Sequence, residues 1–169
     1  MTAVDTFVAV VPAAGIGSRM NSSVAKQYLT LGHKTVIEHT LDALLSHHQI
    51  QRVVVVLHPQ DCTFQSLKIA QNPLIETVIG GTERVDSVLS GLKHCLMMPT
   101  PNVNPWILVH DAARPCVTHK ELNDLFACIN TCEGAILAVP VTDTIKRASS
   151  KENNPIAQIE KTIERTHLW

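Results

Sequence analysis

Residues 52 to 57 read RVVVVL, and this run constrains the fold more than any other feature of the sequence. A strand with one face in water alternates apolar and polar residues, whereas a strand covered on both faces is apolar throughout. A second β-branched run extends from Thr6 to Val11 and stops at Pro12. We therefore expect both runs to be buried strands.

Helical patterns alternate with these strands. A Thr-x-x-Glu capping box opens at Thr35 and again at Thr118, and apolar residues at helical intervals follow each box. A further helix is expected after Gly80-Gly81, with Thr82 as its N-cap. Its predicted buried stripe consists of Val85, Val88, Leu89, Leu92 and Leu96.

Three more strands are expected, at Ile75 to Ile79, Trp106 to Val109 and Ala135 to Val139. Strands that alternate with helices predict an α/β fold with a doubly wound, mostly parallel sheet. Such sheets bind ligands beyond the carboxyl ends of their strands. Functional residues are therefore expected in the loops that follow strands.

The pattern changes after Pro140, where short β-like stretches surround the polar loop SSKENN. This change predicts a hairpin arm. We therefore expect a nucleotide-binding α/β domain over residues 1–140 and a β-arm over residues 141–169, with the C-terminal remainder of the domain missing.

Charge and hydropathy exclude two classes of partner. The 169 residues carry 14 Lys+Arg and 15 Asp+Glu, a net charge of -1, so non-specific attraction to a nucleic-acid backbone has no basis. No apolar run is long enough to cross a bilayer, and the N-terminus lacks the basic segment of a signal peptide. We expect a cytoplasmic protein that contacts neither nucleic acid nor membrane.

The loop after the first strand, PAAGIGSRM, offers small residues whose backbone N–H groups can surround phosphate oxygens. Arg19 and Lys26 flank this loop and could add charge-assisted contacts. The loop lacks the third glycine of the dinucleotide fingerprint, and it is not a Walker A loop. From these residues alone, a phosphate-binding loop and a plain turn with solvated cations both remain open.

Three later segments also carry polar side chains that suit a nucleotide or its partner. Asp111 follows a strand where a metal-binding carboxylate would face phosphates, although an isolated aspartate there is more often a turn cap. The segment GGTERVDS suits a base or ribose pocket, and equally a glycine turn before a capped helix. The segment DTIKR offers a hydroxyl and two cations, or a solvated strand end.

Taken together, five stretches resemble the 2-C-methyl-D-erythritol 4-phosphate cytidylyltransferases of non-mevalonate isoprenoid biosynthesis. The resemblance covers essentially the whole chain and implies a Rossmann-like nucleotidyltransferase fold. It also implies transfer of CMP from CTP to methylerythritol phosphate, giving 4-diphosphocytidyl-2-C-methyl-D-erythritol and pyrophosphate. The matching stretches are PAAGIGSRM with AKQYLTL, TVIEHTLDALL, GGTERVDSVLSGL, VHDAARPCV and AVPVTDTIKR.

The resemblance further implies a role for individual residues. Arg19 and Lys26 would be the catalytic pair that binds the triphosphate, and Asp111 would help to hold Mg²⁺. The implied nucleotide-binding residues are Ala13, Ala14, Gly15, Gly80, Arg84 and Ser87. The implied substrate-binding residues are Arg114, Thr144 and Arg165. The arm would reach into the second subunit of a homodimer.

The chain ends at Trp169, whereas the family that it resembles continues with further strands and helices. We therefore expect an incomplete acceptor site, and a chain that folds and binds CTP but turns over poorly. Alternative functions are a cytidylyltransferase for another polyol phosphate such as ribitol 5-phosphate, and a truncated, non-catalytic CTP-binding protein. An NAD-dependent oxidoreductase is disfavoured by the absent third glycine.

Overall fold

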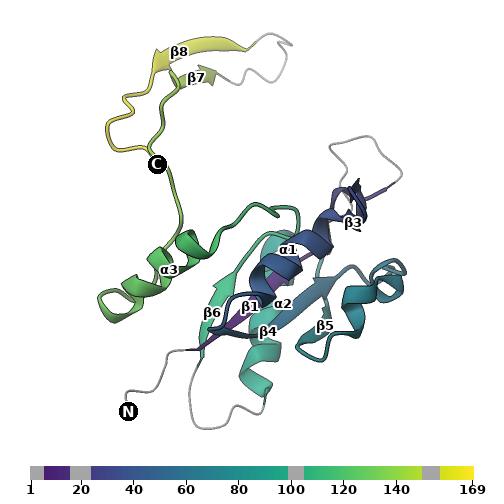
Figure 1. The fold of residues 1–169 in the computed structure, drawn as a ribbon. Coiled ribbons are helices and arrows are strands. Elements are labelled where there is room, and N and C mark those ends of the chain that lie inside the picture. Colours follow the sequence, from purple (N-terminus) through teal and green to yellow (C-terminus); the bar gives the residue numbers. More distant parts are fainter. Residues whose placement is uncertain (1–5, 16–23, 99–104, 150–156) are drawn as a thin grey trace. The chain divides into compact units, whose positions relative to one another are not determined.

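The computed structural model describes residues 6–15, 24–98, 105–149 and 157–169 (Figure 1). The chain divides into two compact units, Met1–Leu122 and Asn123–Trp169. The boundary predicted after residue 140 divides the chain by function, into a nucleotide-binding domain and an arm. It stays a prediction.

A parallel sheet of four strands forms the centre of the first unit (Figure 1). Its order is β5-β4-β1-β6, so β1 and β4 are the inner strands. Val10 of β1 pairs with Val54 of β4 on one side and with Val109 of β6 on the other. The strands are β1 (Phe7–Pro12), β4 (Ile50–Leu57), β5 (Ile75–Ile79) and β6 (Trp106–Val109).

The two inner strands are the valine-rich runs of the sequence, as predicted. The side chains of Val10, Val11 and all four valines from Val53 to Val56 are fully buried. Alternate side chains of a strand point to opposite faces, so complete burial requires a cover on each face. Two helices supply it from opposite sides of the sheet, α1 (Val36–Leu45) and α2 (Arg84–Met97) (Figure 1).

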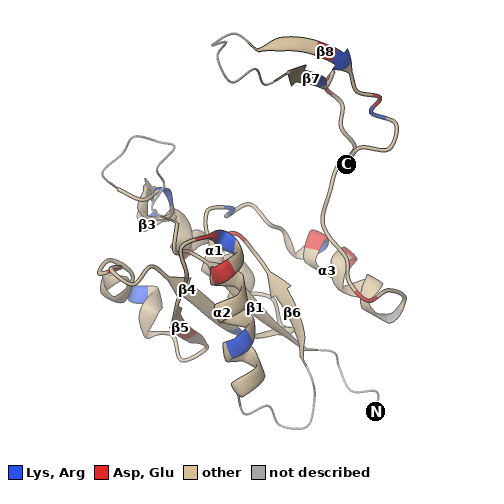
Figure 2. Cartoon of the chain, turned by 180° about the vertical axis from the view of Figure 1, so that it is seen from behind, with Lys and Arg blue, Asp and Glu red and all other residues tan. Residues whose placement is uncertain are grey.

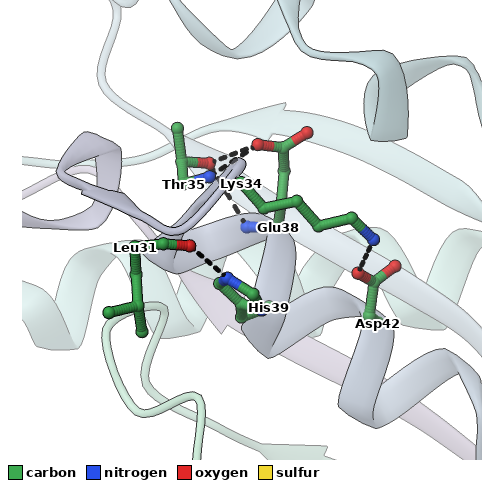
Figure 3. A network of polar contacts seen from close by, with 6 residues as sticks. All are labelled: Leu31, Lys34, Thr35, Glu38, His39 and Asp42. Carbon is green, nitrogen blue, oxygen red and sulfur yellow. Dashed lines mark hydrogen bonds and ion pairs between the residues drawn. The ribbon is translucent and has the colours of Figure 1, made fainter.

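Helix α1 begins at the first predicted capping box. The Thr35 hydroxyl accepts a hydrogen bond from the Glu38 backbone N–H, and the Glu38 carboxylate accepts one from the Thr35 backbone N–H at 2.8 Å (Figure 3). These reciprocal bonds satisfy two N–H groups that the helix itself leaves unpaired. Ile37, Leu41 and Leu44 are fully buried, which confirms the predicted apolar face.

The predicted buried stripe of α2 was wrong at three of its five positions, since only Val88 and Leu92 are half-buried. Val85, Leu89 and Leu96 are exposed, while Ser87, Gly91 and Cys95 are the buried residues of this helix. The cause is close packing on β1, because a Cβ atom added to Gly91 would lie 2.4 Å from Cγ1 of Val10. Small residues line the contact, so the helix backbone approaches the sheet, and Val85, Leu89 and Leu96 lie outside the contact.

The start of α2 also differs from the prediction. The N-cap is Glu83, one residue after the predicted Thr82. The Asp86 carboxylate accepts hydrogen bonds from both the Glu83 backbone N–H and the Thr82 hydroxyl. Thr82 therefore supports the helix start from one position outside the cap.

Short elements connect the main ones in the first unit. A 3₁₀ turn and a two-stranded hairpin precede α1, and two further 3₁₀ turns lie between β4 and β5. They are η2 (Lys26–Tyr28), β2 (Thr30–Leu31), β3 (Lys34–Thr35), η3 (Phe64–Ser66) and η4 (Lys68–Gln71). Helix α3 (His119–Ala127) starts at the second predicted capping box, where the Thr118 hydroxyl accepts from the Glu121 backbone N–H.

The second unit contains the predicted hairpin arm. After η5 (Cys128–Asn130), strands β7 (Lys146–Ser149) and β8 (Gln158–Thr162) pair antiparallel. The strand predicted at Ala135 to Val139 does not form in this structure, and Ile136 and Val139 are exposed. β-branched and apolar residues favour a strand there, but a strand also needs a neighbour for its backbone hydrogen bonds.

Within the described ranges, no helix combines the length and the apolar character that a membrane span requires.

The tight contact of Gly91 predicts the effect of one methyl group. Gly91→Ala adds a Cβ atom 2.4 Å from Val10. Overpacking of this kind costs about 1–3 kcal/mol, more than the roughly 1 kcal/mol that alanine gains over glycine in a helix. Urea unfolding should show a lower free energy of unfolding for Gly91→Ala, with the half-buried neighbour Ser90→Ala as control. A Gly91→Ala protein as stable as the wild type would contradict this packing.

Candidate active site

The carboxyl ends of the four parallel strands bring four loops to one edge of the sheet. These loops follow Pro12, Leu57, Ile79 and Val109. The first and third are tied to β4, because the Ala13 N–H donates to the Val56 carbonyl and the Gly80 N–H to the Leu57 carbonyl, both at 2.8 Å. The candidate residues of the first unit lie on these loops or in the elements that directly follow them, as expected for a doubly wound sheet.

Three predicted nucleotide-binding residues meet beside β4. A Cβ atom on Gly80 would lie 2.6 Å from Oγ of Ser87 and 2.8 Å from Cβ of Ala14. Ser87 is 2% exposed, and its hydroxyl donates to the Glu83 carbonyl at 3.2 Å. The absence of a side chain at Gly80 therefore permits the loop after β1 and the start of α2 to approach each other.

Asp111 is held between two arginines. Its Oδ1 atom accepts hydrogen bonds from Arg84 Nη2 at 2.7 Å and from Arg84 Nε at 3.2 Å, and its Oδ2 atom lies 3.0 Å from Arg114 Nε. Burial raises the pKa of Asp111, but the hydrogen bond and charge of Arg84, together with Arg114, outweigh burial and hold this pKa below its usual value. Asp111 is therefore a carboxylate near neutral pH, and it links Arg84, which is predicted to bind the nucleotide, to Arg114, which is predicted to bind the acceptor.

The chemistry of Asp111 fits a magnesium ligand. Mg²⁺ prefers oxygen ligands and is commonly bound by one or two carboxylates together with substrate phosphates. In the described part of the chain, no group of three or more His, Cys, Asp or Glu side chains could hold a metal by itself. A cation here would depend on the phosphates of a ligand, and it would share Asp111 with the arginines.

The two predicted catalytic cations differ in what the structure says of them. Arg19 lies outside the described residues. Lys26 is exposed at the start of η2. Its neighbour Gln27 is 4% exposed and donates to the carbonyls of Ala13 and Gly15, two residues predicted to contact the nucleotide. Lys26 therefore lies next to the loop that it was predicted to serve.

Gln27 and Tyr28 were not predicted from the sequence. The Tyr28 hydroxyl donates to Asp61 Oδ2 at 2.6 Å, and burial, with this hydrogen bond and the charge of Asp61, raises the pKa of Tyr28. A cavity of about 390 Å³ lies beside these residues and is lined by Gly15, Gln27, Tyr28 and Asp61 among others. The available signal was the position of a glutamine and the only tyrosine of the chain directly after a candidate catalytic lysine.

His110 lies beside Asp111, and its Nδ1 atom is buried without a hydrogen-bond partner among the described residues. Burial lowers the pKa of His110, which favours the neutral imidazole.

The remaining predicted substrate-binding residues, Thr144 and Arg165, belong to the second unit. Backbone hydrogen bonds from Ile163 to Ile145 and from Val141 to Leu168 align the two segments that carry them. The Arg165 guanidinium donates to the Thr142 carbonyl within this pair of segments. The arm therefore brings Thr144 and Arg165 onto facing stretches of chain.

The crowding at Gly80 predicts a specific effect on binding of CTP, the nucleotide that the resemblance implies. Gly80→Ala would force the Ser87 hydroxyl and the Ala14 methyl group apart. We expect the dissociation constant for CTP to rise by about tenfold, which corresponds to about 1.4 kcal/mol. Isothermal titration calorimetry measures this change. Gly134→Ala is the control, because its Cβ atom would meet nothing within 4 Å. An unchanged dissociation constant in a folded Gly80→Ala protein would remove Gly80 from the pocket.

Comparisons with known proteins agree with the resemblance. The family model of IspD, 2-C-methyl-D-erythritol 4-phosphate cytidylyltransferase, matches residues 7–169. Proteins of that name from Tolumonas auensis and Photorhabdus laumondii are each 52% identical to this chain, over 98% and 96% of its length. The chain covers 68% and 67% of these two relatives.

Solved structures show the same fold. A crystal structure of 4-diphosphocytidyl-2C-methyl-D-erythritol synthase superposes with a TM-score of 0.79 at 36% identity, covering 99% of this chain and 72% of the other. The Francisella tularensis 2-C-methyl-D-erythritol 4-phosphate cytidylyltransferase superposes with a TM-score of 0.73 at 27% identity, covering 98% of this chain and 69% of the other. The chain therefore belongs to the IspD family of 2-C-methyl-D-erythritol 4-phosphate cytidylyltransferases.

Proposed function

We propose that this chain transfers CMP from CTP to 2-C-methyl-D-erythritol 4-phosphate, and that the residues gathered at the carboxyl edge of its sheet perform the transfer. Membership of the IspD family makes it a nucleotidyltransferase of isoprenoid biosynthesis. The observation that carries the assignment of the site is the Arg84–Asp111–Arg114 cluster, which lies at the same sheet edge as the Ala14, Gly80 and Ser87 contact.

The reaction needs positioning and charge stabilisation more than acid–base chemistry. A phosphate oxygen of the acceptor attacks the α-phosphorus of CTP in line, and pyrophosphate leaves. The attacking phosphate is already anionic near neutral pH, so no general base has to remove a proton. Negative charge must instead be stabilised at the phosphorus and on the leaving group. Lys26 and Arg19 supply cations for this purpose in our proposal.

The cluster around Asp111 has a separate task. One carboxylate orients two guanidinium groups, because each arginine is bonded to a different oxygen of Asp111. We assign Arg84 to the nucleotide side and Arg114 to the acceptor phosphate, together with Thr144 and Arg165 of the arm. A bound Mg²⁺ would neutralise phosphate charge, and Asp111 is the residue that would hold it.

We further propose a homodimer that forms through the arm. The hairpin of β7 and β8 is exposed at nearly every residue, including Ile159, which is 66% exposed. An isolated two-stranded hairpin is marginally stable in water, so packing against another surface would stabilise it.

The net charge of -1 and the scattered positions of Lys and Arg over several elements (Figure 2) support our expectation of no nucleic-acid partner. The cytosol remains the compartment that we propose.

Pyrophosphate release tests the function directly. The 169-residue chain should release pyrophosphate slowly when given CTP, Mg²⁺ and methylerythritol phosphate, and much more slowly still when ribitol 5-phosphate replaces the acceptor. Lys26→Ala should lower turnover by on the order of 10²-fold, comparable to the loss of one preorganised donor. Its fold should persist because Lys26 is exposed. Equal rates with the two acceptors would reject the proposed substrate, and full activity of Lys26→Ala would reject its catalytic role.

Calorimetry tests the magnesium site without requiring turnover. CTP should bind more tightly with Mg²⁺ than with a chelator, and Asp111→Asn should reduce this difference by on the order of tenfold, about 1.4 kcal/mol. The control is Asp42→Asn. It removes a carboxylate of α1 that is paired with Lys34 (Figure 3). If Asp111→Asn kept the full magnesium dependence, Asp111 would not be a metal ligand.

A further inference from the structure

The turn η2 places three consecutive residues in three directions. A 3₁₀ helix has about three residues per turn, so neighbouring side chains point roughly a third of a turn apart. Lys26 is exposed, Gln27 is 4% exposed, and Tyr28 is half-buried. In so short a turn, fixing the side chains of Gln27 and Tyr28 also fixes the direction in which Lys26 leaves the backbone.

Gln27 is anchored to the loop after β1. Its Nε2 atom donates to the Ala13 carbonyl at 2.9 Å and to the Gly15 carbonyl at 3.2 Å. Backbone carbonyls only accept hydrogen bonds, so the NH₂ end of the amide must face them. A buried amide is favourable only where such bonds replace those with water. The position therefore requires a side chain that donates two hydrogen bonds.

Tyr28 is anchored to a different loop, the one after β4. Its hydroxyl donates to Asp61 Oδ2 at 2.6 Å. The other carboxylate oxygen, Oδ1, accepts from the backbone N–H groups of Thr63 at 2.9 Å and Phe64 at 3.0 Å. Phe64 is fully buried. Asp61 is therefore held by its own loop, and Tyr28 is bonded to a fixed group.

The chain after η2 is attached to α1. The Leu29 carbonyl accepts from the backbone N–H of Val36, the first residue of α1, at 2.9 Å. His39 Nε2, on α1, lies 2.8 Å from the carbonyl of Leu31 in the connecting hairpin (Figure 3). Lys34 is paired with Asp42 in the same network (Figure 3). The downstream end of η2 is thus tied to a helix that packs on the sheet.

We propose that Gln27 and Tyr28 are positioning residues that aim Lys26 at the nucleotide loop by anchoring η2 to the loops after β1 and β4. This inference rests on the proposed role of Lys26 as a catalytic cation. In this proposal the two residues act on the reaction through Lys26. They neither contact the substrate nor serve only to pack the core. Geometry matters because a misplacement of about 1 Å can cost on the order of 10²-fold in rate.

Two substitutions remove the anchors while they preserve volume. Gln27→Met keeps the length of the side chain but has no donor, and Tyr28→Phe removes only the hydroxyl. Gln65→Met is the matched control, because Gln65 is exposed in η3. Each variant is made alone and in combination with Lys26→Ala, and pyrophosphate release gives kcat and KM. Thermal unfolding of every variant separates loss of fold from loss of position.

The expected result is a strongly non-additive cycle. Gln27→Met should lower kcat by about 10–100-fold, and Tyr28→Phe by several-fold, with KM for methylerythritol phosphate little changed. In the Lys26→Ala background, the same substitutions should change kcat by less than about twofold, because there is no ammonium group left to misplace. Gln65→Met should have no effect in either background.

Two outcomes would overturn the inference. Additive losses in the Lys26→Ala background would show that Gln27 and Tyr28 act independently of Lys26, and unchanged kcat in folded single variants would show that the anchors do not matter. Turnover of the wild-type chain, measured first, tests the proposed function separately. If the wild type releases no pyrophosphate, the same cycle is read from the dissociation constant for CTP, with the same non-additivity expected.

Discussion

Parallel pairing of β1 with β4 is the constraint on which the rest of the structure depends. Strands of this kind expose neither face, and the valines of both are buried. Burial on both faces requires a helix on each side, and parallel direction requires every strand to end at the same edge. The loops that carry Ala14, Gly80 and Asp111 come together for that reason. The candidate functional residues therefore meet at this edge because of how the apolar strands pack.

Features with a local signal were predictable. The valine runs and the capping boxes at Thr35 and Thr118 each specify an element within a few residues, and the structure contains them. The buried face of α2 was not predictable from hydropathy, because Gly91 determines it by permitting close approach to Val10. The expected strand at Ala135 to Val139 failed for another reason, since propensity alone does not supply a pairing partner.

In the candidate site, too, local features were predictable and long-range contacts were not. The types of residue at Asp111 and at the glycine loop pointed to phosphates, and the sequence placed them correctly after strands. The bond from Asp111 to Arg84 could not be predicted, because Arg84 approaches from an element 27 positions away. No role was predicted for Gln27 or Tyr28. Their burial depends on Ala13 and Asp61, and sequence spacing does not reveal those contacts.

The contact between Tyr28 and Asp61 makes the chain its own optical reporter. Tyr28 is the only tyrosine, and its environment raises its pKa above that of a solvated phenol. Ionisation of a phenol changes its near-ultraviolet absorption, so an alkaline titration of the folded chain observes this one side chain without any label. Earlier appearance of tyrosinate absorption then signals that Tyr28 has lost its burial or its contact with Asp61.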